Sequence, residues 1–192
     1  MADSRIKQQE IEDDSVDFIL TSPPYGDSVT TVAYGQFSRL SWQWINNDNK
    51  IYSLDEYLLG GKNNVDFNNE IIKYSLILKK QLEEINAKSN ERAKDVLSFY
   101  IDLYKTLKNA HCYLKNNGYF VLVTGNRTVK NIFLRTDLII SELSATLGFK
   151  TEKILCRNII NKRMPAKNSP TNEKGVLCDT MLKENIIFLR KL

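Results

Sequence analysis

Apolar residues gather in four short runs along the chain, and each run predicts a β-strand. The runs are rich in Val, Ile, Leu and Phe and are bounded by polar residues, Gly or Pro, which is typical of strands in a sheet. The second run is apolar on both faces, as expected for a strand at the centre of a sheet. The four runs are VDFILT (16–21), YFVLVTG (119–125), FKTEKILCRNII (149–160) and NIIFLRKL (185–192).

The segments between these runs predict helices and loops. Apolar positions follow helical spacing over residues 34–45 and again over a long region, about 71–114. The Asn-Asn-Gly sequence at 116–118 indicates the end of that long region, and a further helix is expected within 126–148, ending at its terminal glycine. The Asn-rich segment 45–70, interrupted by two glycines, predicts a loop with a short helix inside it.

The order of these elements predicts an α/β fold. Helices connect the first three strands, and such connections favour parallel strands joined by right-handed crossovers. The last connection, residues 161–179, is polar and lacks a helical pattern, which suits an antiparallel return. We therefore expect a single domain over residues 1–192, with a mostly parallel sheet, a C-terminal antiparallel hairpin and a helical insertion at 45–114.

Composition places few limits on the function. Apolar residues make up 42% of the 192 residues, as in ordinary globular domains, and the net charge of +4 permits an anionic partner without requiring one. Three cysteines and one histidine without metal-ligand spacing argue against a zinc site. The polar N-terminus has no signal-peptide pattern and no apolar run approaches membrane-spanning length, so we expect a cytoplasmic protein without membrane contact.

The first apolar run ends abruptly in Ser22, Pro23, Pro24 and Tyr25. Two consecutive prolines cannot continue a strand, because neither has an N–H to donate and both have a fixed φ. The chain is therefore stiff at the carboxyl end of a strand, which is where ligands bind in open α/β sheets. A rigid surface turn that carries a tyrosine is the alternative for these four residues alone, and the strand before them favours a ligand site.

Ser-Pro-Pro-Tyr suits the activation of an exocyclic amine on a nucleobase. The lone pair of such a nitrogen is delocalised into the ring, and acceptors around its N–H bonds can turn it toward an electrophile. The Ser22 hydroxyl and the Pro23 carbonyl are candidate acceptors, held by the two prolines with little entropy left to lose. The Tyr25 ring is a candidate stacking partner for a base taken out of the duplex. A sulfonium methyl group as electrophile needs no metal and no covalent enzyme intermediate.

The segment TSPPY after an apolar strand resembles the catalytic motif (D/N/S)-P-P-(Y/F) of DNA amino-methyltransferases, and is most similar to that of the cytosine-N4 members. The resemblance implies a Rossmann-like sheet and methyl transfer from S-adenosyl-L-methionine to cytosine N4 or adenine N6. It also implies that Ser22, Pro23, Pro24 and Tyr25 form the catalytic motif. Asp3, in the segment ADSR, would meet the adenine of the cofactor. The three later strands resemble the remaining strands of the same half of the family's sheet, with a closing hairpin.

Part of the family's pattern is absent. The sequence lacks the F-x-G-x-G turn that binds the cofactor and the acidic residue that follows the second strand of the family's sheet. In the family these elements lie beside the catalytic strand, so residues 16–21 would form an exposed apolar edge. Either a second polypeptide or a deleted segment supplies the cofactor-binding half, which we favour, or the chain is a remnant. A remnant would cover the edge with its own helical insertion or by forming a homo-oligomer.

Five basic residues are candidates for contacts with DNA phosphates, which give affinity without sequence specificity. They are Arg39, Arg127, Lys162, Arg163 and Lys167. A solvated surface is the alternative for each of them. The preferred hypothesis is the catalytic half of a DNA amino-methyltransferase, inactive as this chain alone. The alternative is a catalytically silent nucleic-acid-binding or assembly module with a methyltransferase-like scaffold.

Overall fold

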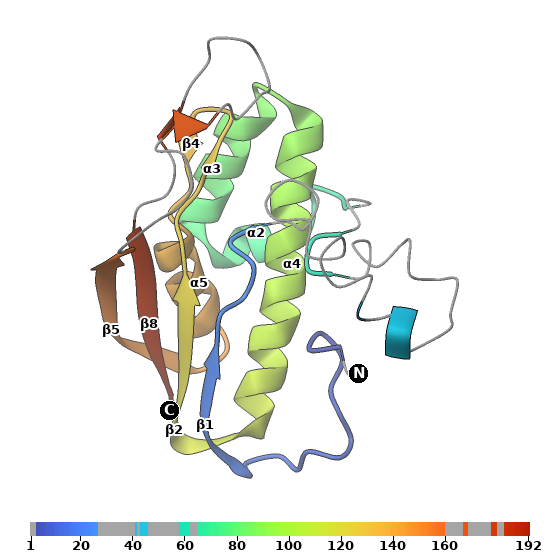
Figure 1. Cartoon of the computed structure of the whole chain (residues 1–192), viewed down its shortest axis with the longest axis vertical. Coiled ribbons are helices and arrows are strands. Elements are labelled where there is room, and N and C mark those ends of the chain that lie inside the picture. The colour runs from blue at the N-terminus through green and yellow to red at the C-terminus, as the bar shows by residue number, and fades with distance from the viewer. Residues whose placement is uncertain are drawn as a thin grey trace.

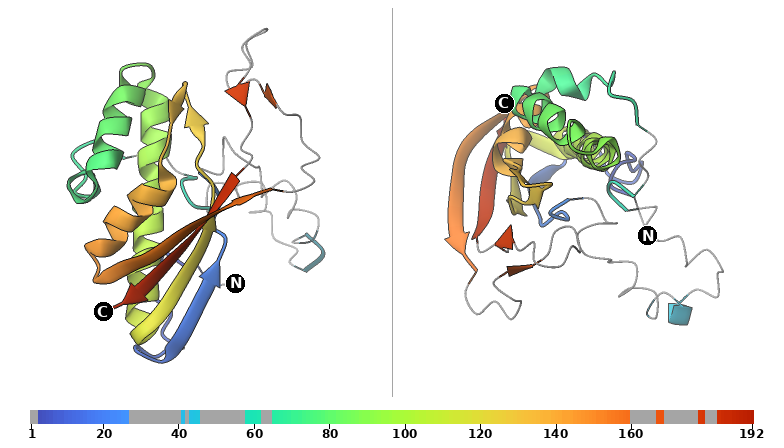
Figure 2. Two further views of the ribbon diagram at one scale, coloured as in Figure 1. Left: turned by 90° about the vertical axis from the view of Figure 1, so that its left-hand side faces the viewer. Right: turned by 90° about the horizontal axis from the view of Figure 1, so that it is seen from above.

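A computed structural model describes residues 3–26, 41, 43–45, 58–61, 65–159, 167–168, 178–179 and 183–192. The described residues form a sheet with helices packed on one of its faces (Figure 1). Seen from above in Figure 2, the strands curve around these helices, and the other face of the sheet points away from them.

The main sheet has four strands, namely β1 (Val16–Thr21), β2 (Leu114–Thr124), β5 (Phe149–Asn158) and β8 (Lys183–Lys191). Their order is β1-β2-β8-β5. β1 is parallel to β2, while β8 is antiparallel to both β2 and β5. The four predicted strands and the C-terminal antiparallel hairpin are confirmed, and only β8 runs against the other three strands.

The helices α2 (Ile71–Tyr74), α3 (Leu76–Asn86) and α4 (Asn90–Tyr113) lie between β1 and β2 in the sequence. The predicted long helical region is confirmed, but it is divided at Ser75 and Ser89. Each of these serines accepts a hydrogen bond on its side chain from a backbone N–H in the first turn of the next helix, which is how serine caps a helix. α5 (Thr136–Ala145) lies within the segment 126–148, as expected.

The predicted helix end at 116–118 is wrong, because α4 ends before these residues and they lie inside β2. The register between β1 and β2 shifts at this point, as in a β-bulge. Asn117 has a φ of 67°, and a Cβ on Gly118 would lie 3.0 Å from the Asp17 carbonyl oxygen of β1. Asn117 therefore allows the bulge, and Gly118 allows β1 and β2 to approach each other closely.

Two short strand pairs differ from the sequence prediction. β3 (Thr128–Val129) and β4 (Ile132–Phe133) form a hairpin between β2 and α5. Its tip residues Lys130 and Asn131 have φ values of 48° and 63°, as a two-residue type I′ turn requires. A second pair, β6 (Lys167–Asn168) with β7 (Cys178–Asp179), lies within the segment predicted as a loop.

The core lies between the helices and one face of the sheet. Alternate residues of the two central strands belong to it, because successive side chains of a strand point to opposite faces. Phe120, Leu122, Ile187 and Leu189 are at most 1% exposed. The helices contribute apolar residues to the same cluster, among them Leu82 of α3, Leu103 of α4 and Ile140 of α5.

Only a part of the predicted helix over residues 34–45 is described. Residues 41 and 43–45 are helical, and Trp44 is 90% exposed, so it does not contribute to the core as an apolar position of an amphipathic helix would. The rest of that helix and most of the predicted loop 45–70 lie outside the described residues. None of the helices that the structure describes has the length and apolar character needed to cross a membrane. The division into one domain with an insertion at 45–114 stays a prediction.

Candidate active site

The Ser-Pro-Pro-Tyr segment lies directly after β1, at the carboxyl end of that strand, as the sequence predicts. Pro23 is buried, Pro24 and Tyr25 are half-buried, and Ser22 is exposed. The buried proline fixes the segment to the fold, while the Ser22 hydroxyl stays accessible to a ligand. The segment therefore combines a rigid backbone with an accessible polar side chain.

β8 brings a carboxylate to the same end of the sheet, because this strand begins where its antiparallel neighbours end. The Tyr25 hydroxyl donates a hydrogen bond of 2.5 Å to Oε1 of Glu184. Arg157 of β5 donates from Nε to Oε2 at 2.8 Å, and its Nη2 lies 2.7 Å from the same oxygen. Both partners lower the pKa of the Glu184 carboxyl, and the bond from Tyr25 is the larger cause.

Sequence reasoning did not identify Glu184 and Arg157. The two residues face each other in register on β8 and β5. Opposite charges near the open end of a predicted antiparallel hairpin are a signal that could have located them. Their proximity to Tyr25 depends on the sheet order, which the sequence alone did not fix.

A small cavity adjoins the motif. Its volume of about 10 Å³ has room for roughly one water molecule, not for a nucleobase. A base stacked on Tyr25 would therefore lie on the outer side of the ring. The cavity is lined by Tyr25, Gly26, Val96, Phe99, Tyr100, Arg127, Leu134 and Thr136.

Arg127, one of the predicted phosphate contacts, is brought to this cavity from the segment after β2. A Cβ at position 26 would lie only 1.9 Å from Nη1 of Arg127, so the close approach of the guanidinium requires Gly26. Arg127 is half-buried against the catalytic segment, and its predicted contact with DNA stays a prediction.

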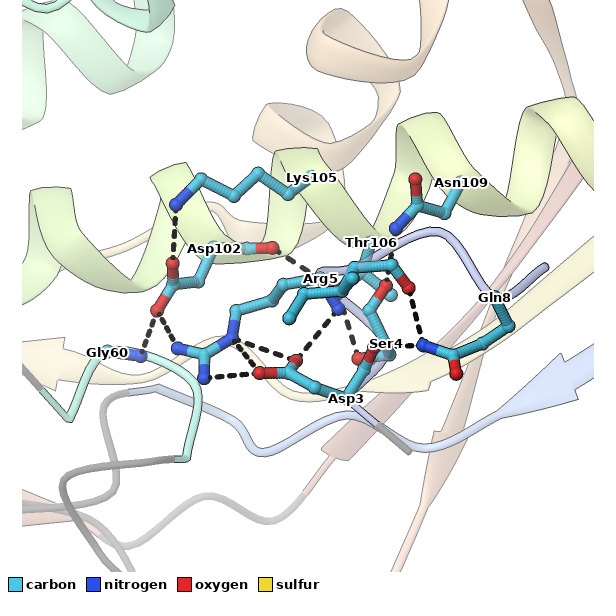
Figure 3. A network of polar contacts seen from close by, with 10 residues as sticks. Asp3, Ser4, Arg5, Gln8, Gly60, Asp102, Lys105, Thr106 and Asn109 are labelled. Atoms are coloured by element: carbon cyan, nitrogen blue, oxygen red, sulfur yellow. Dashed lines mark hydrogen bonds and ion pairs between the residues drawn. The ribbon is translucent and has the colours of Figure 1, made fainter. Parts of the chain in front are cut away.

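Figure 3 shows a polar network that joins the N-terminal segment to α4. The Asp3 carboxylate accepts hydrogen bonds of 2.7–3.1 Å from Nε, Nη2 and the backbone N–H of Arg5. Arg5 also donates from Nη1 to Asp102 of α4 at 2.9 Å, and Asp102 accepts a further bond from the Gly60 backbone N–H. The hydrogen bonds from Arg5 lower the pKa of the Asp3 carboxyl. The network fixes the orientation of Asp3, whose side chain remains 36% exposed.

The other predicted site residues are not placed. Arg39, Lys162 and Arg163 lie outside the described residues, and only the backbone of Lys167, in β6, is described. Within the described part of the chain, no group of three or more His, Cys, Asp or Glu residues is arranged to hold a metal ion.

Among the described strands, β1 forms one edge of the sheet, and it is apolar, as the sequence predicts. Phe18 is 55% exposed and Leu20 is 62% exposed. Tyr119 of β2, the register partner of Phe18, is 39% exposed. Together Phe18, Leu20 and Tyr119 form what we call the β1 patch.

Comparisons with known proteins agree with a methylase fold. No family model matches the chain. Over 189 residues, 95% of its length, the chain is 45% identical to the Type II methyltransferase M.MvaI of Kocuria varians, and the aligned part is 42% of that protein. The solved structure of TTHA0409 from Thermus thermophilus, provisionally identified as a DNA modification methylase, has a TM-score of 0.50 and 18% identity over 100% of the chain and 52% of that protein. The chain therefore spans about half the length of the methylases that it matches.

Proposed function

We propose that this chain is the catalytic part of an S-adenosyl-L-methionine-dependent DNA methyltransferase. Its substrate is an exocyclic amine of a flipped base, cytosine N4 in preference to adenine N6, and its sheet is one part of a Rossmann-like sheet. The position of Ser22–Tyr25 carries the proposal, since an accessible hydroxyl and an aromatic ring lie together at the carboxyl end of β1. The 45% identity to a Type II methyltransferase supports it.

Ser22 and Pro23 activate the amine in this proposal. The Ser22 hydroxyl and the Pro23 carbonyl accept hydrogen bonds from the two amine hydrogens, which directs the nitrogen lone pair out of conjugation with the base. Because Pro23 is buried and both prolines restrict the backbone, these acceptors are pre-oriented before the base binds. S-adenosyl-L-methionine, when bound, would supply the methyl group; its sulfur would keep the electron pair of the broken C–S bond, and the methylated amine would release one proton to the solvent.

Tyr25 holds the flipped base. Its half-buried ring follows the two prolines directly, so the ring and the acceptors are parts of one rigid segment. Stacking on an aromatic ring contributes roughly 1–3 kcal/mol per base in single-stranded binding proteins, enough to offset part of the loss of stacking in the duplex.

For the cofactor, the described residues offer one suitable polar group. Asp3 keeps part of its carboxylate exposed and is oriented by Arg5, so it can accept a hydrogen bond from the adenine amine. The sequence lacks a G-x-G turn after a strand. The cofactor site therefore needs a further segment.

We infer that this further segment, here called the complementing polypeptide, is a separate chain or the remainder of a longer one. The chain matches only 42% of M.MvaI, β1 is an edge strand of the described sheet, and the β1 patch leaves apolar side chains exposed on the face of the sheet opposite the core. A homo-oligomer that covers the same patch is the alternative. Arg39, Arg127, Lys162, Arg163 and Lys167 are proposed to bind DNA phosphates.

A catalytically silent nucleic-acid-binding or assembly module is the second candidate function. The lack of a G-x-G turn after a strand in the sequence favours it. The two functions differ in one observable, which is methyl transfer after addition of the complementing polypeptide.

The test is methyl transfer from radiolabelled S-adenosyl-L-methionine to duplex DNA by this chain together with the complementing polypeptide, with nucleoside mass spectrometry of the product. N4-methylcytosine is expected. Ser22→Ala and Tyr25→Ala should each lower transfer by about a hundredfold or more, because each removes a contact with the reacting base.

Ser15→Ala and Tyr74→Ala are matched controls at the start of β1 and on α2, away from the motif, and should transfer at the wild-type rate. Full activity of both Ser22→Ala and Tyr25→Ala would overturn the catalytic role of the motif. If the product is N6-methyladenine, only the assignment of cytosine as the target base is overturned.

A further inference from the structure

The hydrogen bond between Tyr25 and Glu184 links the catalytic segment to the hairpin of β5 and β8. Three segments far apart in the sequence meet here, namely the loop after β1, the start of β8 and the end of β5. Glu184 is largely shielded, with 13% of its side chain exposed, and Arg157 covers it from the solvent side with 60% of its own side chain exposed. The carboxylate is thus held between a phenol and a guanidinium.

The two oxygens of Glu184 have separate partners. Arg157 contacts Oε2 through two nitrogens, which leaves Oε1 to accept the hydrogen bond from Tyr25. Hydrogen bonds to charged groups are about twice as strong as neutral ones, and contact through two nitrogens of a planar guanidinium also fixes orientation. The carboxylate therefore cannot turn without breaking one of these contacts.

A fixed acceptor at the hydroxyl end of Tyr25 determines the direction of the ring. The two prolines before Tyr25 restrict the backbone but leave χ1 and χ2 of the tyrosine free. The bond to Glu184 restricts these angles, together with the packing of the half-buried ring, since the hydroxyl must stay within hydrogen-bond distance of Oε1. A ring with one orientation loses less entropy when a base stacks on it.

We propose that Glu184, held in place by Arg157, is a positioning residue that orients the Tyr25 ring for stacking on the target base. This inference rests on the proposed function of Tyr25. It assigns a role in the active site to the last hairpin of the sheet, whose own strands carry no part of the Ser-Pro-Pro-Tyr motif.

The contact itself is tested on the full chain, without DNA or cofactor. The chain is labelled with ¹³C at the glutamate carboxyl carbons, and the Glu184 signal, assigned by its loss in Glu184→Gln, is followed by NMR against pH. Because the bond from Tyr25 is the largest cause of the lowered pKa of Glu184, Tyr25→Phe should raise that pKa. An unchanged pKa of Glu184 in Tyr25→Phe would overturn the proposal.

The effect on catalysis is tested with the complementing polypeptide present. Glu184→Ala and Tyr25→Phe should each lower methyl transfer by about tenfold, as expected for loss of one hydrogen bond to a charged group, and Glu184→Gln should retain more activity because its amide oxygen still accepts. The double variant should be no worse than either single variant, because both remove the same bond.

Glu152→Ala is the matched control, since Glu152 forms the same kind of β5–β8 ion pair with Arg190 at the other end of the hairpin, and it should transfer at the wild-type rate. Additive losses in the double variant, or an equal loss in Glu152→Ala, would show a merely structural role and overturn the proposal. If the wild-type chain and the complementing polypeptide together show no methyl transfer, the proposed function is contradicted instead. The NMR titration then still decides whether Glu184 holds Tyr25.

Discussion

The two edges of the sheet expose different kinds of side chain. β5, at one edge, presents the charged residues Lys150, Glu152, Lys153 and Arg157, all exposed, and one exposed large apolar residue, Leu155 at 38%. β1, at the other edge, exposes Phe18 and Leu20, with Asp17 as its one charged residue. Natural proteins protect true sheet edges with charges that prevent pairing with another strand. By that criterion β5 has the composition of a true edge, whereas β1 has the composition of an interior strand that lacks a neighbour.

This difference connects the fold to the proposed function. The apolar edge lies on the strand that carries the Ser-Pro-Pro-Tyr segment at its end. A further strand paired with β1 would therefore place its own carboxyl or amino end beside Ser22. In our account that neighbour belongs to the complementing polypeptide and completes the cofactor site.

The free energy of unfolding of the free chain should differ most between a variant in the core and a variant in the β1 patch. Leu122 is fully buried, whereas Leu20, on the adjacent strand, is 62% exposed. Leu122→Ala should lower the free energy of unfolding by about 2–5 kcal/mol, and Leu20→Ala by less than about 0.5 kcal/mol. Urea unfolding followed by circular dichroism measures both values. An equal loss in the two variants would mean that β1 is already covered in the free chain, as in a homo-oligomer.

The charged edge should respond to pH, with a smaller effect. Arg190 first and Lys150 second lower the pKa of the Glu152 carboxyl through hydrogen bonds. Since the folded-state pKa lies below the unfolded value of about 4.5, the stabilising contribution of Glu152 is present above that value and is lost as the pH falls through the folded-state pKa.

Glu152→Gln should therefore be less stable than the wild type at neutral pH and equally stable in acid, well below the unfolded-state pKa of about 4.5. Urea unfolding at several pH values measures the difference. Leu20→Ala is the control from the apolar edge, and its difference from wild type should not change with pH. A Glu152→Gln difference that persists in acid contradicts the assigned ion pair.

The sequence predicted those features that depend on local patterns. The four apolar runs located β1, β2, β5 and β8, and the two prolines placed the candidate site at a strand end. The open edge at β1 was predicted from the resemblance to the methyltransferase family, because the G-x-G turn that lies beside the catalytic strand in that family is missing. These predictions succeed because strand periodicity and proline geometry are properties of neighbouring residues.

Features that depend on tertiary contacts were missed or misread. Asn117 and Gly118 match a helix end as well as a bulge, and only the pairing of β1 with β2 decides between them. The Tyr25–Glu184 contact joins residues 159 positions apart and requires the strand order to be known. The close approach of Arg127 to Gly26 was not predicted, because it is visible only once the loop is placed, and the predicted contact of Arg127 with DNA stays a prediction.

Hydrogen–deuterium exchange of the backbone amides, measured for the chain alone and with the complementing polypeptide, shows whether β1 gains a neighbour. Amides of β1 should exchange about tenfold more slowly, or slower still, in the mixture, while amides of β5 should not change. Leu20→Asp should prevent this protection, because a carboxylate would have to be buried at the contact. Protection at β5, or methyl transfer by the mixture without protection at β1, would contradict the account.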